Sequence, residues 1–167
     1  LGAILAQILS PEQYDENVAV KGGSERVEFA VKFPGEGDRP VYLPIDSKFP
    51  ADAYTRLLDA YDTGDRQLIK AATDGLRNAV LKAAKDIRTK YISPPYTTAI
   101  MFLPFEGLYA EVLRLGLVDT LQRDYRINIA GPTTMAAMLN SFQMGFRSLA
   151  LQKQSGEVWD TLAKVRT

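Results

Sequence analysis

A carboxylate and an ammonium group stand two residues apart where an apolar run of the sequence ends. The run VYLPID covers residues 41–46, and Ser47 and Lys48 follow it directly. In a β-strand, side chains at positions i and i+2 lie on the same face, so Asp46 and Lys48 are expected to point the same way. Such a pair either forms an ion pair at the protein surface, or combines a metal-binding carboxylate with a cation that stabilises developing negative charge.

Glu28 is the third residue of this candidate site. It lies in the run VEFAVKF (27–33), whose alternating apolar and polar residues predict a strand, and a Gly- and Pro-rich turn joins that run to the strand of Asp46 as a β-hairpin. If the turn is centred near Gly37, Glu28 lies directly opposite Asp46, where the β-carbons of paired residues are ~4.5–5.5 Å apart. A slip of one residue in the register would place Glu28 on the opposite face, so a solvated, outward Glu28 is the alternative.

Two carboxylates at that separation repel each other unless a cation lies between them. The pattern therefore predicts a divalent metal site in which Glu28 and Asp46 bind Mg²⁺ or Mn²⁺ together with water molecules. Lys48 would lie beside the ion, where it could orient or deprotonate an attacking water or neutralise developing negative charge. Asp46, Lys48 and Glu28 are thus the candidate catalytic residues.

The composition excludes several other kinds of catalytic site. The 167 residues are 46% hydrophobic and 24% charged, which is typical of one globular domain spanning residues 1–167. The chain contains no cysteine and no histidine, which rules out disulfides, thiolate or imidazole metal ligands, and Ser–His or Cys–His catalysis. Metal ligands must then be oxygen atoms, which favour magnesium, manganese or calcium. The formal net charge of zero gives no general sign of nucleic-acid binding.

The remaining pattern predicts an α/β fold with a mixed central β-sheet flanked by helices, because an antiparallel hairpin is joined to later strands through helical crossovers. Apolar spacing predicts a helix over residues 1–9, followed by a polar loop that extends to residue 26. After the hairpin, the predicted elements are helices between 51 and 90 with a break at 63–65, a breaker at 93–96, a strand at 97–104, a helix at 106–117, a strand at 125–132, a long helix and a last amphipathic helix that contains Trp159.

Polar residues of the later helices are candidates for contact with nucleic acid. The GPTT segment offers free backbone amides at a helix N-terminus, so Thr133 marks a possible phosphate seat, although a simple cap at Thr133 or its neighbour is the commoner arrangement. Gln143 and Arg147 lie four residues apart on one helix face, and Arg147 or Lys153 could contact phosphate. The alternative is an ordinary polar stripe. Glu106 is predicted to cap the first turn of its own helix, where a carboxylate interacts favourably with the helix dipole. The alternative is a role in the site, which its place at the end of a predicted strand would allow.

Several segments, taken together, resemble a known family. An acidic residue on one strand, a hairpin, and Asp46-Ser47-Lys48 on the next strand resemble the pattern of PD-(D/E)xK nucleases. More closely, VEFAVKFPG, LPIDSKFP, FLPFEGLYAEVL and AGPTTMAAMLNSFQMGFRSLALQ resemble, in this order, the RmuC family, which is associated with DNA recombination. The resemblance covers residues 1–165, nearly the whole chain. The short D-x-K motif alone is unspecific, whereas the four segments together are specific.

The resemblance implies a restriction-endonuclease-like core, a DNA-directed nuclease role and a divalent metal ion. Members of the family commonly carry a coiled coil, and often an N-terminal membrane anchor, upstream of this region. Two departures stand out: Glu28 occupies a position usually written as Asp, and the first helix, LGAILAQILS, lacks the carboxylate that the superfamily often adds there. The chain opens inside a helix without an initiator methionine, so we expect a fragment whose missing ligand lies upstream.

These observations lead to three expectations about function. The first is a DNA-processing domain in which a metal-activated water attacks a phosphodiester in line, with Asp46 and Glu28 as metal ligands. The second is an inactive DNA-binding or scaffold module on a nuclease fold, which the lack of a strongly basic face favours. The third is a metal-free interaction domain whose first helix continues an upstream coiled coil, through which the protein forms a homo-oligomer. Because no apolar run approaches the ~18 residues of a membrane span, we expect a cytoplasmic domain that does not itself contact a membrane.

Overall fold

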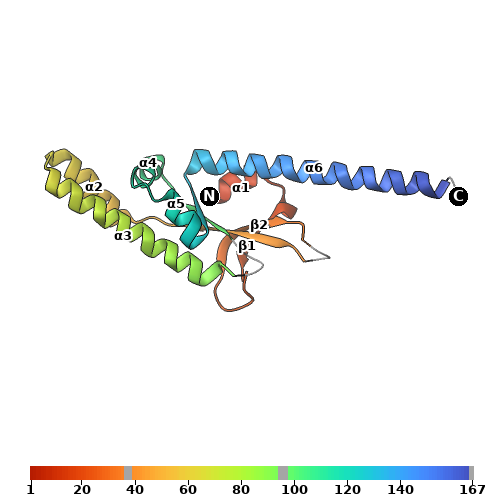
Figure 1. Ribbon diagram of the computed structural model, residues 1–167, viewed down its shortest axis with the longest axis horizontal. Coiled ribbons are helices and arrows are strands. Elements are labelled where there is room, and N and C mark those ends of the chain that lie inside the picture. Colours follow the sequence, from red (N-terminus) through yellow and green to blue (C-terminus); the bar gives the residue numbers. More distant parts are fainter. Residues whose placement is uncertain (36–38, 94–97, 166–167) are drawn as a thin grey trace.

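The computed structural model describes residues 1–35, 39–93 and 98–165, without the side chains of 150, 153 and 165. Its described strands form one five-stranded mixed sheet in the order β1-β2-β3-β4-β5, with helices on both faces (Figure 1). The elements are α1 (Gly2–Ile8), η1 (Pro11–Gln13), β1 (Tyr14–Val18), β2 (Val27–Phe33), β3 (Val41–Ser47), α2 (Ala51–Thr63), α3 (Arg66–Tyr91), β4 (Ala99–Phe102), α4 (Glu106–Arg114), α5 (Val118–Thr120), η2 (Leu121–Tyr125), β5 (Ile127–Ala130) and α6 (Pro132–Val165).

The sheet combines an antiparallel half and a parallel half that share β3. Strands β1, β2 and β3 pair antiparallel, whereas β3, β4 and β5 run parallel and are joined through helices. In the β2–β3 hairpin, Phe29 pairs with Ile45 and Val31 with Leu43. This is the register predicted from the sequence, and its next pair would be Glu28 and Asp46. The predicted turn around residue 37 lies outside the described residues, as do residues 94–96 of the predicted breaker.

Two hydrophobic cores lie on opposite faces of the sheet. Helices α1 and α6 cover one face, where Leu5, Met135 and Leu139 pack against Val31 and Ile45. Helices α2 to α4 cover the other face, where the main buried side chains are Leu57, Leu76, Val80, Ile87, Met101 and Leu108. Because consecutive strand residues point to opposite faces, Asp46 and Lys48 share the face of α3 while Ile45 points to α6.

The segment between α1 and β2 differs from the expectation. It was expected to be a polar loop, but residues 14–18 form β1, which pairs with β2 at the edge of the sheet. The sequence YDENV carries no run of alternating apolar residues, because an edge strand with intermediate and exposed side chains needs none. Tyr42 of β3 donates a hydrogen bond to the carboxylate of Asp15 across 2.6 Å, which ties the edge strand to its second neighbour.

The C-terminal part of the chain also differs from the expectation. Two helices were expected after β5, but α6 is one continuous helix of 34 residues, and its C-terminal half extends beyond the body of the domain (Figure 1). The Ser-Gly pair at 155–156 weakens a helix by only ~1 kcal/mol and does not end it. Leu151, Val158 and Trp159 of this extension are more than half exposed. No helix in the described part of the chain is long and apolar enough to cross a membrane.

Candidate functional site

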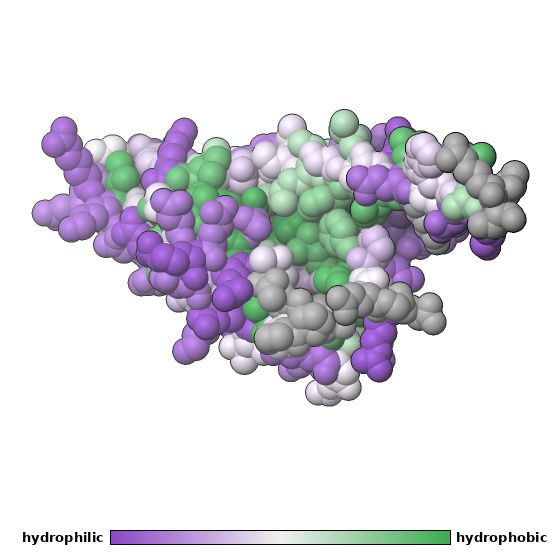
Figure 2. Space-filling view, turned by 45° about the vertical axis from the view of Figure 1, so that its right-hand side comes forward, coloured by the Kyte–Doolittle hydropathy of each residue, from purple (hydrophilic) through white to green (hydrophobic). Residues whose placement is uncertain are grey.

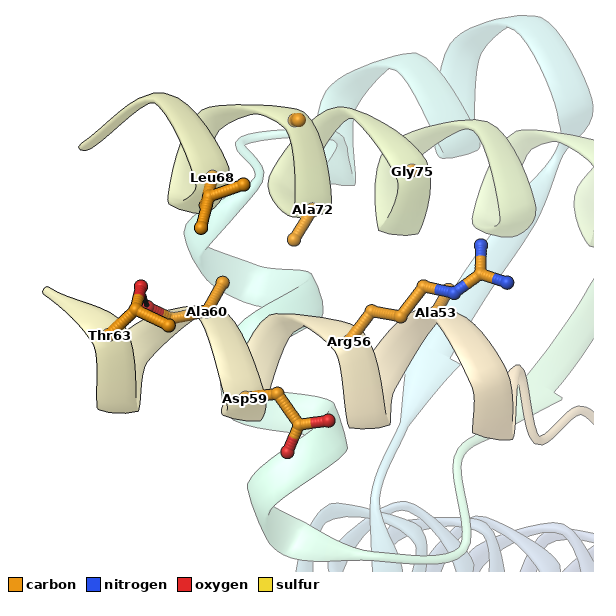
Figure 3. Close-up of a pocket in the computed structure, with 9 residues that line it drawn as sticks. Ala53, Arg56, Asp59, Ala60, Thr63, Leu68, Ala72 and Gly75 are labelled. Atoms are coloured by element: carbon orange, nitrogen blue, oxygen red, sulfur yellow. Dashed lines mark hydrogen bonds between the residues drawn. The ribbon is translucent and has the colours of Figure 1, made fainter. Parts of the chain in front are cut away.

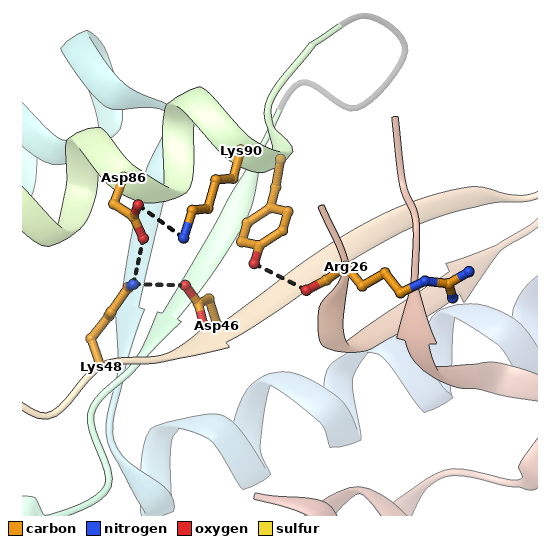
Figure 4. A network of polar contacts seen from close by, with 6 residues as sticks. Arg26, Asp46, Lys48, Asp86 and Lys90 are labelled. Atoms are coloured by element: carbon orange, nitrogen blue, oxygen red, sulfur yellow. Dashed lines mark hydrogen bonds and ion pairs between the residues drawn. The ribbon is translucent and has the colours of Figure 1, made fainter. Parts of the chain in front are cut away.

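Two carboxylates and two ammonium groups form a network at the end of β3, shown in Figure 4. The Nζ atom of Lys48 lies 3.2 Å from Oδ2 of Asp46 and 2.6 Å from Oδ2 of Asp86. Lys90 lies one helical turn beyond Asp86 and contacts its other carboxylate oxygen at 3.1 Å. We call these residues, Asp46, Lys48, Asp86 and Lys90, the lysine–carboxylate network. Asp46 and Lys48 therefore do lie on one face, as their spacing predicted.

Strand β3 and helix α3 position the network. The backbone N–H of Lys48 donates to the carbonyl of Phe102 at 2.9 Å, which continues the pairing of β3 with β4 and fixes the direction of the lysine. Asp65 caps the N-terminus of helix α3, because its side chain accepts hydrogen bonds from the backbone amides of Gln67 and Leu68 in the first turn. Its buried stripe, which includes Val80, Ala84 and Ile87, packs on the sheet and leaves Asp86 at the border of that stripe, beside the end of β3.

The network sets the protonation states of its members. Burial works to lower the pKa of Lys48, but its hydrogen bonds and charge attraction to Asp86 and Asp46 outweigh this, so the pKa lies above 10.5. The hydrogen bond from Lys48 holds the pKa of Asp86 below its ordinary value of 3.8, with Lys90 acting in the same direction. Lys48 is thus a cation at neutral pH. A lysine that keeps its proton can stabilise negative charge but is a poor base.

Glu28 lies on the same sheet face but outside the network. It is exposed, and in the described part of the chain it takes part in no hydrogen bond or ion pair. The observed β2–β3 pairs end at Phe29 and Ile45, and one further step in the same register would set Glu28 opposite Asp46. Its carboxylate is therefore available for a ligand from solvent.

The donor set consists of carboxylate oxygens, which suit magnesium and manganese. The described residues contain no group of three or more acidic side chains that could hold a metal ion between them. Glu28 and Asp46 supply two carboxylates near solvent, which fits magnesium because this ion commonly keeps several waters and binds through one or two carboxylates.

A pocket of about 340 Å³ opens beside the network. Its lining includes Lys48, Phe49, Lys82 and Asp86. The ring of Phe49 lies 5.0 Å from that of Phe105, and both side chains are about half exposed, at 50% and 52%. The two rings follow directly after β3 and β4, at the carboxyl ends of parallel strands, where α/β proteins commonly bind ligands. The network is thus open to a molecule from solvent.

The predicted phosphate seat at the start of α6 already has a partner. The backbone N–H of Thr133 donates to Oε1 of Glu106 at 2.6 Å, and Thr134 exchanges hydrogen bonds with the backbone of Gly131. The hydrogen bonds from Thr133 hold the pKa of Glu106 below its ordinary value of 4.5. Glu106 lies in the first turn of α4, as predicted, but its carboxylate caps a different helix, α6. A phosphate at Thr133 would have to displace it.

Two of the other predicted nucleic-acid contacts, Gln143 and Arg147, belong to the helix on the far face of the sheet. Gln143 and Arg147 belong to α6, which packs on the face opposite the lysine–carboxylate network. Arg147 is exposed, and Oε1 of Gln143 is buried without a hydrogen-bond partner among the described residues. Lys153 lies in the same helix, and its side chain is not described. The structure therefore does not bring Gln143 and Arg147 to Asp46 and Lys48.

The sequence prediction missed Asp86. It lies 38 residues from Lys48, and only the crossing of α3 over β3 brings the two together. The one signal in the sequence was a single acid in the basic segment KAAKDIRTK.

A second pocket, about 470 Å³, lies between α2 and α3 and is lined mostly by small side chains such as Ala60, Ala72 and Gly75, with Arg56 and Asp59 as charged members (Figure 3). It shares no residue with the network.

The fold and site define an α/β domain with a mixed sheet and a lysine–carboxylate network at the end of one strand. The sequence matches the model of the RmuC family over residues 1–167, and the chain belongs to this family. Two proteins of Xylella fastidiosa, from strains Temecula1 / ATCC 700964 and 9a5c, are named "DNA recombination protein RmuC homolog" and are each 52% identical to the chain over 173 aligned positions. The match covers 100% of this chain and 38% of each relative. No solved structure matches the chain.

Proposed function

We propose that this chain is a DNA-processing domain of a DNA recombination protein and acts as a divalent-metal-dependent phosphodiesterase. The observation that carries the proposal is the pairing of Asp46 with Lys48 at 3.2 Å, at the solvent-accessible end of β3 and next to the Phe29–Ile45 pair that joins β3 to the strand of Glu28. The names of the two relatives support a role in recombination. The resemblance to PD-(D/E)xK nucleases supports the type of chemistry.

We further propose that the core is restriction-endonuclease-like. The support is topological: the antiparallel strands β1 to β3 are followed, through helices, by β4 parallel to β3. The candidate catalytic residues lie on β2 and β3, on one face of this core. Manganese could replace magnesium, since both ions accept oxygen ligands.

Each residue has a distinct role in this proposal. Glu28 and Asp46 would hold the metal ion, which when bound supplies Lewis-acid activation of water and of the phosphodiester. Lys48, which the network keeps protonated, stabilises negative charge on the phosphate oxygens and does not remove a proton from water. Asp86 is a positioning residue, because it holds the ammonium group of Lys48 beside Asp46.

Substitution of the paired residues tests the proposal. We expect Asp46→Ala and Lys48→Ala to reduce magnesium-dependent cleavage of labelled single-stranded and duplex DNA by about 10²–10³-fold, because the first removes a ligand of the metal ion and the second removes the cation that stabilises charge on the reacting phosphate. Matched controls are Asp62→Ala and Lys70→Ala, which remove exposed charges on α2 and α3 outside the network and should leave cleavage unchanged. Far-ultraviolet circular dichroism checks that each variant is folded. Unchanged cleavage in both test variants would refute the mechanism.

A second function is favoured by a specific observation. Lys48 is held by two carboxylates at once, and such a network can serve as a purely structural link between β3 and α3. The domain would then be an inactive DNA-binding or scaffold module. Calorimetric titration with magnesium and manganese separates the two functions: metal binding that is lost in Asp46→Ala supports the phosphodiesterase, whereas salt-sensitive DNA binding without metal binding or cleavage supports the module.

A further inference from the structure

Three basic side chains converge on a hollow beside the C-terminal end of α3. Lys21, Lys85 and Arg88 line it, together with Thr89, Ile92, Asp124 and Tyr125, and its volume is about 610 Å³. We call it the cationic hollow. Its residues come from three distant parts of the chain: the turn after β1, helix α3 and the η2 segment. The fold therefore assembles these charges, which do not adjoin in the sequence.

The charges in the cationic hollow are not neutralised by carboxylates. Nζ of Lys21 donates to the carbonyl of Thr89 at 2.7 Å, and a guanidinium nitrogen of Arg88 donates to the carbonyl of Asp124 at 2.7 Å. In the part of the chain that the structure describes, none of the three basic side chains forms an ion pair. Asp124 is the acidic residue of the lining, and its carboxylate already pairs with Arg123 at 3.2 Å. The hollow thus keeps an excess of positive charge.

Lys85 differs in this respect from the lysines of the lysine–carboxylate network. Lys48 and Lys90 contact carboxylates, whereas Lys85 contacts none among the described residues. Backbone carbonyls hold Lys21 and Arg88 in place, and Lys85 lies in the same lining. Because no carboxylate balances these three positive charges, the hollow suits an anion with several negative oxygens. A hollow of about 610 Å³ is larger than one phosphate group requires, which favours a chain of phosphates.

The position of the cationic hollow links it to the candidate site. Lys85 and Arg88 flank Asp86 in the sequence of α3, and successive helix residues are turned by about 100°, so their side chains leave the helix in different directions. The side chain of Asp86 contacts Lys48 within the lysine–carboxylate network, whereas Lys85 and Arg88 line the cationic hollow. One strand of DNA passing over this end of α3 could contact both.

We propose that the cationic hollow binds the phosphodiester backbone of DNA and holds it next to the lysine–carboxylate network. This assignment adds a DNA-binding surface to the proposed function, and it rests on that function for the choice of DNA as the ligand. It replaces Arg147 of α6 as the phosphate contact, since the N-terminal half of α6 covers the opposite face of the sheet. Phosphate contacts position a nucleic acid without reading its sequence, so the hollow predicts binding without sequence preference.

Substitution of Lys85 tests this inference most directly, because its side chain makes no hydrogen bond or ion pair within the described residues and its loss should not disturb the fold. DNA binding is measured by fluorescence anisotropy of labelled single-stranded and duplex oligonucleotides, with EDTA present and over a series of salt concentrations. We expect Lys85→Ala to weaken binding roughly threefold or more, and to reduce the salt slope of log K by about 0.7–0.9, the value of one phosphate contact. Arg88→Ala should act in the same direction.

Lys70→Ala is the matched control, since Lys70 is exposed on the same helix, outside the hollow. It should change neither the affinity nor the salt slope. Equal effects of Lys70→Ala and Lys85→Ala, no effect of Lys85→Ala, or no DNA binding by the wild-type chain would each overturn the inference. Inorganic phosphate, titrated at constant ionic strength, is the second probe: binding of phosphate that depends on Lys85, without binding of DNA, would assign the hollow to a free phosphate compound instead.

The outcome is separable from that of the proposed function. Binding that depends on Lys85, in a chain that cleaves no DNA, would uphold the cationic hollow and refute the phosphodiesterase. Cleavage that depends on Asp46, with Lys85→Ala binding and cleaving like the wild type, would do the reverse.

Discussion

Lys48 is the central residue of the candidate site. Its contacts with Asp46 and Asp86 keep it protonated, so it can stabilise negative charge but is a poor base. The spacing of Asp46 and Lys48 predicted a shared face, because side-chain direction in a strand follows from sequence position alone. The contact with Asp86 could not be predicted in this way. It depends on the angle at which α3 crosses the sheet and on the rotation of the helix about its axis, and both are set by packing of the buried stripe.

Asp86→Asn tests the contribution of this contact to stability. Because the pKa of Asp86 is lowered in the folded state, its stabilising effect is present above pH 3.8 and is lost as the pH falls below that value. We expect the variant to lose about 1 kcal/mol of unfolding free energy at pH 7, the upper end for a solvent-screened pair, and to approach the wild type as the pH falls through the lowered pKa of Asp86. Urea unfolding at several pH values measures this. Asp62→Asn, an exposed carboxylate outside the network, should show no such difference; a loss in Asp86→Asn that persists at low pH would argue against the ion pair.

At the scale of elements, a helix or strand could be predicted where its buried side chains leave a regular apolar pattern in the sequence. The β2–β3 hairpin and its register were predictable because alternating apolar and polar residues mark β2 as a strand and the Gly- and Pro-rich segment between the strands marks the turn that sets their pairing. Strand β1 was not, because an edge strand buries too little to impose that pattern. The contact between α4 and the start of α6 was also hidden, since Glu106 and Thr133 are 27 residues apart.

Gly131 tests how closely α4 approaches the start of α6. A Cβ atom at this position would lie 3.0 Å from Cβ and Cγ of Tyr109, which are held close to the backbone of α4 and cannot easily move. We expect Gly131→Ala to lower the unfolding free energy by about 1–3 kcal/mol through overpacking. Gly75→Ala is the matched control, because nothing lies within 4 Å of its added Cβ and it should stabilise α3 by ~0.5–1 kcal/mol. Chemical denaturation compares the two; a neutral Gly131→Ala would mean that the helices separate at little cost.

At the scale of the whole molecule, a layer of helices covers each face of the sheet, and the two faces differ in role. The face of α3 carries the lysine–carboxylate network and the cationic hollow, so proposed chemistry and proposed DNA contact lie together. The face of α1 and α6 is mainly a packed core. A space-filling view shows a large hydrophobic area in the middle of one side of the molecule, between polar surfaces (Figure 2). The C-terminal half of α6 leaves this body, and there its apolar side chains meet solvent.

Trp159, the only tryptophan of the chain, reports on that extension, because its side chain is 71% exposed. Tryptophan emission moves to shorter wavelength when the indole ring leaves water. We therefore expect native emission close to that of N-acetyltryptophanamide in the same buffer, equally accessible to acrylamide, and little changed by urea at concentrations where far-ultraviolet circular dichroism shows unfolding. Emission at shorter wavelength, protected from acrylamide, would mean that the end of α6 is covered in solution. Repeating the emission measurement at several protein concentrations would then show what covers the helix. A second copy of the chain dissociates on dilution, whereas a contact within one chain does not.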